Sequence, residues 1–340
     1  MEPISPPSSQ EAKGTEQTEG VGISQSQEPT RSDNFWFEDG SVVLQAELKL
    51  FRVHRTLLAR HSPIFQDMFL VGQNDDDSNE QVDGRPLVHL LDSASDVEHL
   101  LYYVYDRSES TNPFLSLPYI SAKLLLGKKY NIRPMYDDAL DILETNFPSN
   151  ITISEHCPLI DYWDRLNFER AGLLDVINLA LKANVLTLLP AAYLMTAGDL
   201  NAILDGIERE DGSRATIPFA SQRACILGRD KILREAPTVV FSWCQQSTPL
   251  PQFCVSQALC RAARNAVVQE IWNRNCDDLE TYLNPVDSWQ VGNYKLCNVC
   301  LHHARNKHNE GRRKMWDALP TYFGLPPWDE LLEQARLNAP

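Results

Sequence analysis

The sequence lacks any apolar run long enough to cross a bilayer, and residues 1–10 carry neither the basic nor the apolar segment of a secretory signal. These two absences exclude the usual marks of a membrane or secreted protein. Apolar residues still make up 43% of the chain, which is typical of a globular core. We therefore expect a soluble intracellular protein, with nucleus and cytoplasm both open and no membrane partner.

Basic residues are scarce, since 31 Lys and Arg face 46 Asp and Glu and the net charge is −15. Nucleic-acid binding depends on Lys and Arg at the phosphates, so nucleic acid is not an expected partner. The exception is a local group, which consists of Arg305, Lys307, Arg312, Arg313 and Lys314. It could face an acidic partner or nucleic acid, although a solvated helix face is the plainer interpretation.

Catalytic signatures are also missing. The chain has no G-x-S-x-G elbow, phosphate-binding loop, dinucleotide fingerprint or kinase motif. A hydrolase would have to use His and Asp residues of the kind that any chain of this length contains. We therefore predict no enzymatic activity, no catalytic residue and no cofactor.

The first 156 residues contain no cysteine, and the eight cysteines lie at positions 157, 225, 244, 254, 260, 276, 297 and 300. In a reducing compartment we expect thiols rather than disulfides. Cys297-x-x-Cys300 with His303 has the residue types of a zinc site. However, the gap between Cys300 and His303 is much shorter than the roughly 12-residue spacer of a zinc finger. We therefore expect reduced, mostly buried cysteines on a helix and no bound metal.

Strand patterns are confined to the first half of the chain. Residues 1–32 are rich in Ser, Pro, Glu and Gln, which predicts a disordered tail. Residues 41–45 and 48–53 read as a β-hairpin, and residues 86–92 read as a third, buried strand. Residues 74–80 form an acidic run that is typical of a surface loop.

Helical patterns follow. Ser95 and Glu98 have the spacing of a capping box, and the helix after it carries an apolar stripe of Val97, Leu100, Leu101, Val104 and Tyr105. Further helices are predicted at residues 119–130, 135–147, 168–183, 190–195, 221–233, 255–272 and 298–319. The order favours an α+β domain at 33–147, followed by an all-α domain at 148–340.

The most specific pattern is F-x-V-H-R-x-L-L-A-x-x-S-P-x-F-x-x-M-F at residues 51–69, in which Ser62-Pro63 reads as a helix start. It resembles the signature of the BTB/POZ domain. The residues that carry this resemblance are Phe51, His54, Arg55, Leu58, Ser62, Phe65, Met68 and Phe69, with Tyr103 on a later helix. Residues 316–320 and 323–328 resemble the tails of BTB proteins abundant in mushroom-forming fungi.

The resemblance implies a non-enzymatic protein–protein interaction module that self-associates, or pairs with another BTB chain, through residues 33–147. In that family the basic residue after the histidine belongs to a charged pocket near the dimer partner. Its usual aspartate falls at the position of Ser41, while Asp39 lies two residues earlier. The carboxylate that would form an ion pair with Arg55 is therefore displaced or absent. We expect His54 to be hydrogen-bonded at a helix corner.

Two further functions stay open. One is an adaptor for cullin-3 ubiquitin ligases, because residues 101–105 resemble the helix that packs beside that scaffold. The family's short segment with an apolar anchor and a glutamate has only Arg107-Ser108-Glu109 as a counterpart, without the anchor, so we expect weak or absent cullin binding. The other is a transcription- or chromatin-associated factor that uses the C-terminal Cys/His and basic segment.

Overall fold

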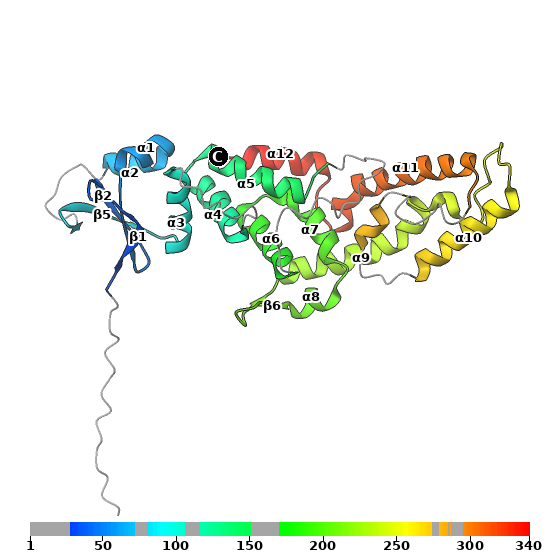
Figure 1. Ribbon diagram of the computed structural model, residues 1–340, viewed down its shortest axis with the longest axis horizontal. Coiled ribbons are helices and arrows are strands. Elements are labelled where there is room, and N and C mark those ends of the chain that lie inside the picture. The colour runs from blue at the N-terminus through cyan, green and yellow to red at the C-terminus, as the bar shows by residue number, and fades with distance from the viewer. Residues whose placement is uncertain are drawn as a thin grey trace, which may run out of the picture.

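A five-stranded sheet occupies one end of the molecule, and the helices α10 and α11 reach the other end (Figure 1). The computed structural model describes residues 28–71, 80–105, 116–150, 170–273, 279–284, 286 and 295–340. Within these ranges, no helix combines the length and apolar character that a membrane span requires.

The predicted hairpin is confirmed as β2 (Val42–Ala46) and β3 (Lys49–Val53), which pair antiparallel. β5 (Arg85–Leu90) joins β2 in parallel, and β4 (Gln81–Val82) pairs with its start. β1 (Thr30–Trp36) lies parallel to β3 at the opposite edge, so the order is β1-β3-β2-β5-β4. The sequence did not predict β1. The boundary of the tail at residue 32 is therefore wrong, because strand pairing begins at Thr30.

The third strand exists, but the prediction that it is buried is wrong. Of its residues only Leu90 is buried, and the following Leu91 is 99% exposed. The reason lies in its place in the sheet. β4 contributes only two residues beyond it, so β5 is close to an edge where apolar side chains meet solvent.

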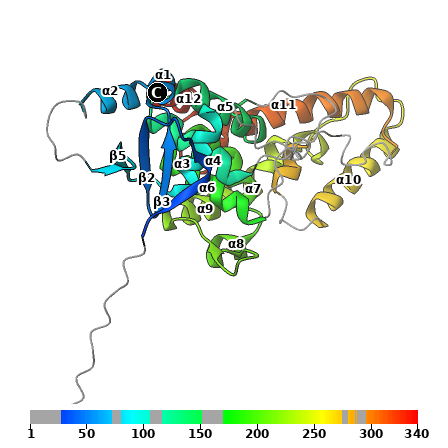
Figure 2. The same ribbon diagram turned by 60° about the vertical axis from the view of Figure 1, so that its left-hand side comes forward.

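The described residues of the N-terminal domain also contain five helices. They are α1 (Arg55–His61), α2 (Pro63–Val71), α3 (Ala94–Val104), α4 (Leu117–Lys129) and α5 (Arg133–Asn146). Figure 2 shows α1 and α2 at one end of the sheet. The predicted stripe on α3 is confirmed for Val97, Leu100, Leu101 and Val104, which are buried, whereas Tyr105 is the half-buried C-cap. The predicted capping box is wrong: the N-cap is Ser93, whose hydroxyl accepts from the Asp96 N–H.

The rest of the described chain is helical, as predicted. It comprises α6 (Arg170–Ala183), α7 (Leu189–Thr196), α8 (Leu200–Asp205), α9 (Phe219–Val239), α10 (Gln257–Asn273), α11 (Asn298–Tyr322) and α12 (Trp328–Asn338). Three short 3-10 helices, η2 (Leu186–Leu188), η3 (Ser242–Cys244) and η4 (Leu279–Leu283), connect them. The sequence missed α8, α12 and a small ribbon of β6 (Ile207–Glu208) and β7 (Arg214–Ala215).

The hydrophobic core does not stop at residue 147. Leu124 of α4 and Leu143 of α5 share one buried cluster with Leu174 and Ile177 of α6. Polar contacts follow the same path: Lys128 Nζ donates to the Ala183 carbonyl at 2.8 Å, and Arg133 Nη1 donates to the Pro340 carbonyl at 3.1 Å. α12 lies beside α5 in Figure 1. The predicted boundary is therefore a change of secondary structure and not a gap in packing.

The acidic loop at 74–80, the predicted tail up to residue 27 and the Arg107-Ser108-Glu109 segment lie wholly or almost wholly outside the described residues. At the other end of the chain, Trp316 and Trp328 stack with ring centroids 6.0 Å apart, and Trp328 Nε1 donates to the Trp316 carbonyl at 2.8 Å. The two C-terminal segments that carried the fungal resemblance therefore pack on each other.

Helix α11 crosses the end of α9 at Gly311. A Cβ atom at this position would lie 2.7 Å from the Cα of Val240 and would also meet the Val239 carbonyl. Backbone atoms cannot move aside as a flexible side chain can, so the crossing requires a residue without a side chain. This requirement outweighs the preference of helix interiors for alanine, which is about 1 kcal/mol.

Gly311→Ala is therefore expected to lower the free energy of unfolding by about 1–3 kcal/mol, the usual cost of overpacking a core. Urea denaturation of the full-length chain measures it. Asn306→Ala, at an exposed position of the same helix, is the matched control and should be neutral or slightly stabilising. Equal stability of Gly311→Ala and wild type would contradict the close crossing.

Candidate interaction surface

Most signature residues build the interior of the N-terminal domain. Phe51, Leu58, Phe65 and Phe69 are buried, and Met68 is half-buried. Phe65 stacks on Tyr130 with ring centroids 4.4 Å apart. These side chains hold the corner between α1 and α2 against the helices that follow, and they offer no exposed chemistry.

Ser62 fixes the corner itself. Its hydroxyl accepts from the Phe65 N–H at 3.1 Å and donates to the Tyr130 carbonyl at 2.5 Å. The first contact satisfies a donor in the first turn of α2, as the Ser-Pro pattern predicts. The second connects that turn to the end of α4, 68 residues later in the chain.

His54 lies where β3 passes into α1 and is hydrogen-bonded there, which confirms the sequence-based interpretation. The Tyr105 hydroxyl accepts from the His54 backbone N–H at 2.9 Å and lies 2.8 Å from His54 Nδ1. His54 Nε2 is 3.1 Å from Asp39 Oδ1, and this hydrogen bond lowers the pKa of the exposed Asp39 carboxyl. The Phe37 ring stacks on the Tyr105 ring, with centroids 4.8 Å apart, so an aromatic side chain packs beside these hydrogen bonds.

Asp39, two residues before the family's usual aspartate position, thus contacts the His54 side chain. Arg55 uses the position that the family gives to the aspartate in a different way: its backbone N–H donates to the Ser41 hydroxyl at 3.0 Å. Ser41 and Asp39 therefore divide between them the support of residues 54 and 55. The charged pocket implied for Arg55 is not tested by these contacts and stays a prediction.

Tyr103 is half-buried on α3. Its ring lies 6.3 Å from the His61 ring, and the Lys123 ammonium is 5.5 Å from its centroid. Burial, followed by the charge of Asp138, raises the pKa of Tyr103. Lys123 is itself buried and pairs with Asp138 at 3.3 Å. Tyr103 therefore joins α3 to α1 and α4 and is only partly available to a partner.

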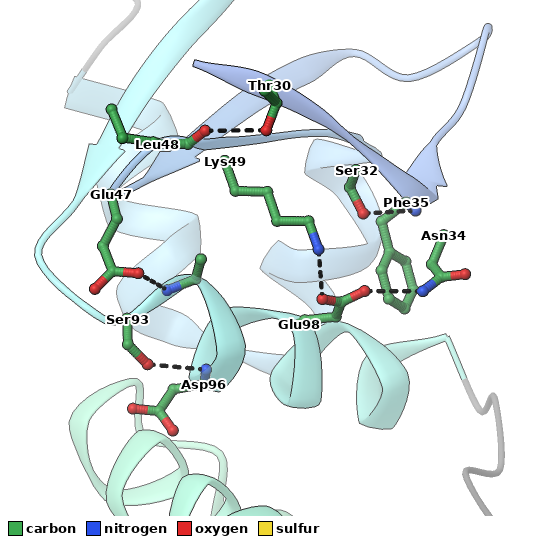
Figure 3. Close-up of polar contacts among 11 residues, drawn as sticks. Thr30, Ser32, Asn34, Phe35, Glu47, Leu48, Lys49, Ser93, Asp96 and Glu98 are labelled. Carbon is green, nitrogen blue, oxygen red and sulfur yellow. Dashed lines mark hydrogen bonds and ion pairs between the residues drawn. The ribbon is translucent and has the colours of Figure 1, made fainter. Parts of the chain in front are cut away.

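Glu98 anchors the first strand to the domain. Figure 3 shows its carboxylate between Lys49 of β3 and Asn34 of β1, at 2.8 and 2.9 Å. Partial burial raises the pKa of Glu98, but the two hydrogen bonds outweigh burial and the net pKa lies below its usual 4.5. The sequence assigned Glu98 to a capping box and so missed this role. Its partners come from β1 and β3, which local sequence spacing cannot reveal.

The N-terminal end of α3 is also tied to the sheet. The Ala94 N–H donates to Glu47 Oε2 at 3.0 Å, from the turn between β2 and β3 (Figure 3). Phe35 of β1 is buried and packs edge-on against Tyr102 of α3, with centroids 4.9 Å apart. β1 is therefore held by an apolar contact as well as by Glu98.

Helix α2 exposes two large apolar side chains among polar ones, since Gln66 and Asp67 are also exposed. Ile64 and Leu70 of α2 are 41% and 57% exposed. Together with the edge strands β1 and β4, these side chains are the part of the domain that a partner could cover.

Of the three metal-ligand candidates, Cys297 and Cys300 lie in a cysteine cluster, and His303 does not. Cys297 is the half-buried N-cap of α11, and Cys300 is buried in its first turn. Their sulfurs join those of Cys254 and Cys260, and all four lie within 4.8 Å of one another, whereas His303 is outside the group. Hydrogen bonding from the Cys300 N–H lowers the pKa of Cys297 to about 6. The Cys254-x₅-Cys260 spacing was the signal that the sequence analysis passed over.

The basic cluster does not form a continuous cationic surface. Arg312 is buried and donates from Nε to the Leu283 carbonyl and from Nη1 to Asn309 Oδ1. Lys307 and Lys314 both pair with Glu310, at 2.9 and 2.8 Å. These contacts favour the interpretation as a helix face over a nucleic-acid interface, so the chromatin-factor hypothesis gains no support from them.

Comparison with known families gives one match: the model of the BTB/POZ domain matches residues 38–147. This match confirms the BTB/POZ domain that the sequence predicted. The described residues after it are mostly helical, which was also predicted. No curated protein and no solved structure matches the chain significantly. BTB/POZ domains are protein-interaction modules and are generally non-enzymatic, and they mediate self-association.

Glu98→Gln is expected to lower the free energy of unfolding at pH 7 by about 1 kcal/mol, because it removes the charge from two hydrogen bonds. The folded pKa of Glu98 is depressed, so its contribution is complete above pH 4.5 and is lost as the pH falls through the folded value. The difference from wild type should therefore shrink between pH 7 and about pH 3. Urea titrations at both pH values measure it.

Glu210→Gln, at an exposed position in the helical region, is the control for removing one carboxylate. A difference between Glu98→Gln and wild type that does not vary with pH would contradict the assigned pairing.

Proposed function

We propose that the chain is a non-enzymatic interaction and oligomerisation protein, in which the BTB/POZ domain associates with a second copy. The observation that carries the proposal is the match at residues 38–147, together with a signature segment whose buried residues form an intact core. The side chains that the family uses to build the fold are thus present and packed. Pairing with another BTB chain is the heteromeric form of the same proposal.

The exposed face of α2 supports self-association. Ile64 and Leu70 lie on the same short helix and expose apolar surface that a second copy could bury. A two-fold dimer brings one patch against itself, so apolar side chains are self-complementary where charges of one sign would repel.

The packing of the chain supports an adaptor role for the whole chain. α4 and α5 share a core with α6, so a partner bound to the helical region would be held in a fixed position relative to the BTB/POZ domain. Two binding surfaces on one rigid body are what an adaptor requires. We place this protein inside the cell, as the sequence analysis expects, and retain the resemblance to fungal BTB proteins as part of the proposal.

The full-length chain is expected to be a dimer at micromolar concentration by light scattering, and Ile64→Asp combined with Leu70→Lys should shift it to a monomer. The introduced charges suit the helix, because Asp lies near the N-terminus of α2 and Lys near its C-terminus. Loss of association can therefore be assigned to the surface.

Leu204→Lys is the matched control, since Leu204 is a comparably exposed leucine at 56% on α8, far along the chain. It should leave the dimer intact. A wild-type chain that stays monomeric at high micromolar concentration would overturn self-association and leave only pairing with another BTB chain.

The cullin-3 hypothesis is tested separately. We expect weak or no binding between the full-length chain and a cullin-3 N-terminal domain in calorimetry, because anchors buried at the centre of an interface carry most of its energy and this chain lacks the apolar anchor. Tyr103 is half-buried between His61 and Lys123, which limits what it can offer in place of that anchor. Submicromolar binding that Tyr103→Ala abolishes would contradict this expectation.

A further inference from the structure

Four cysteine sulfurs meet at the end of the molecule farthest from the sheet. Cys254 precedes α10 and Cys260 lies in its first turn, while Cys297 caps α11 and Cys300 lies in its first turn. Figure 1 shows the start of α11 near the loop that leads into α10. Two pairs, 37 residues or more apart in the sequence, therefore converge on one point.

The spacing of the sulfurs fits a single metal ion. All four lie within 4.8 Å of one another, and the Cys254 and Cys297 sulfurs are 4.0 Å apart. A Zn–S bond of about 2.3 Å in a tetrahedron places sulfurs roughly 3.8 Å apart. Disulfides would draw the sulfurs together in pairs at about 2.05 Å, whereas all four cysteines are free thiols. An iron–sulfur cluster distributes its cysteines over several irons and so separates the sulfurs further.

We propose that Cys254, Cys260, Cys297 and Cys300 bind one zinc ion at a structural site. Four protein thiolates complete a tetrahedral zinc, so no position remains for water or substrate. The site therefore stabilises the fold and supplies no catalysis. The proposal replaces the sequence-based expectation of no bound metal, which considered only Cys297, Cys300 and His303.

The surroundings of the sulfurs suit an anionic metal centre. The Cys297 N–H donates to Cys260 Sγ at 3.4 Å, the kind of contact that orients a ligand from outside the coordination shell. Arg264, one turn after Cys260 on α10, is buried and near the sulfurs, and its Nη1 donates to the Thr248 carbonyl at 2.9 Å. Zinc with four thiolates carries a charge of about −2, so a buried guanidinium offsets part of it.

Several apolar side chains beside the cysteines are exposed, although Leu296 and Leu301 pack against the core of the helical region. Phe253 and Val255, on either side of Cys254, are 74% and 80% exposed. Leu259 and Val299, each next to a cysteine of the group, are also exposed. Where apolar burial covers only one side of a site, a metal crosslink is a common way to hold the other side in place. Zinc would fasten the start of α10 to the start of α11.

Elemental analysis of tag-free, reduced full-length protein tests the site. We expect about one zinc per chain after desalting, and its loss in Cys260→Ser and in Cys297→Ser. Cys225→Ala is the control, because Cys225 is a buried cysteine in the core of α9 and outside the group. It should keep its zinc.

Cobalt substitution keeps the test decisive if a serine variant fails to fold. Protein stripped with a chelator and refilled with Co²⁺ should show the visible absorption typical of tetrahedral thiolate coordination, and stripping should lower the unfolding temperature. Folded, reduced protein with no metal and no cobalt spectrum would overturn the proposal. Iron in place of zinc in the purified protein, or zinc retained by both serine variants, would also overturn it.

Discussion

The packing of α4 on α5 is the interaction on which the rest of the structure depends. Gly127 makes it possible, since a Cβ there would lie 2.8 Å from the Tyr136 nitrogen. The closely packed pair buries residues on two of its faces. Leu126 and Met135 belong to the core of the sheet domain, whereas Leu124 and Leu143 belong to the core of the helical region. One helix pair thus contributes buried residues to both cores.

The two ends of the molecule are stabilised by different physics. Near the sheet, aromatic side chains such as Phe51 and Phe65 are fully buried, and hydrophobic burial suffices. At the far end, Phe253 and Val255 lie in solvent, and the proposed zinc would supply what a core does elsewhere. The close crossing of α9 and α11 at Gly311 fixes these two helices relative to each other. A partner surface formed by both helices would depend on that crossing.

Most of the signature residues have a structural role in the N-terminal domain. Ser62 links α2 to the end of α4, and His54 holds Tyr105 and Asp39. The carboxylate and hydroxyl beside the histidine thus fix its position at the start of α1. The partner surface proposed on α2, at Ile64 and Leu70, consists of exposed residues that are not among the buried signature positions.

The sequence by itself determined the hairpin, the helix corner at Ser62-Pro63, the stripe on α3 and most of the later helices, because periodicity and capping are local properties. It did not determine the parallel pairing of β1 with β3, the edge position of β5 or the true partners of Glu98. These depend on segments distant in the chain. The meeting of Cys254 and Cys260 with Cys297 and Cys300 was likewise decided only by the tertiary structure, since the packing of two helices sets the distance between the pairs.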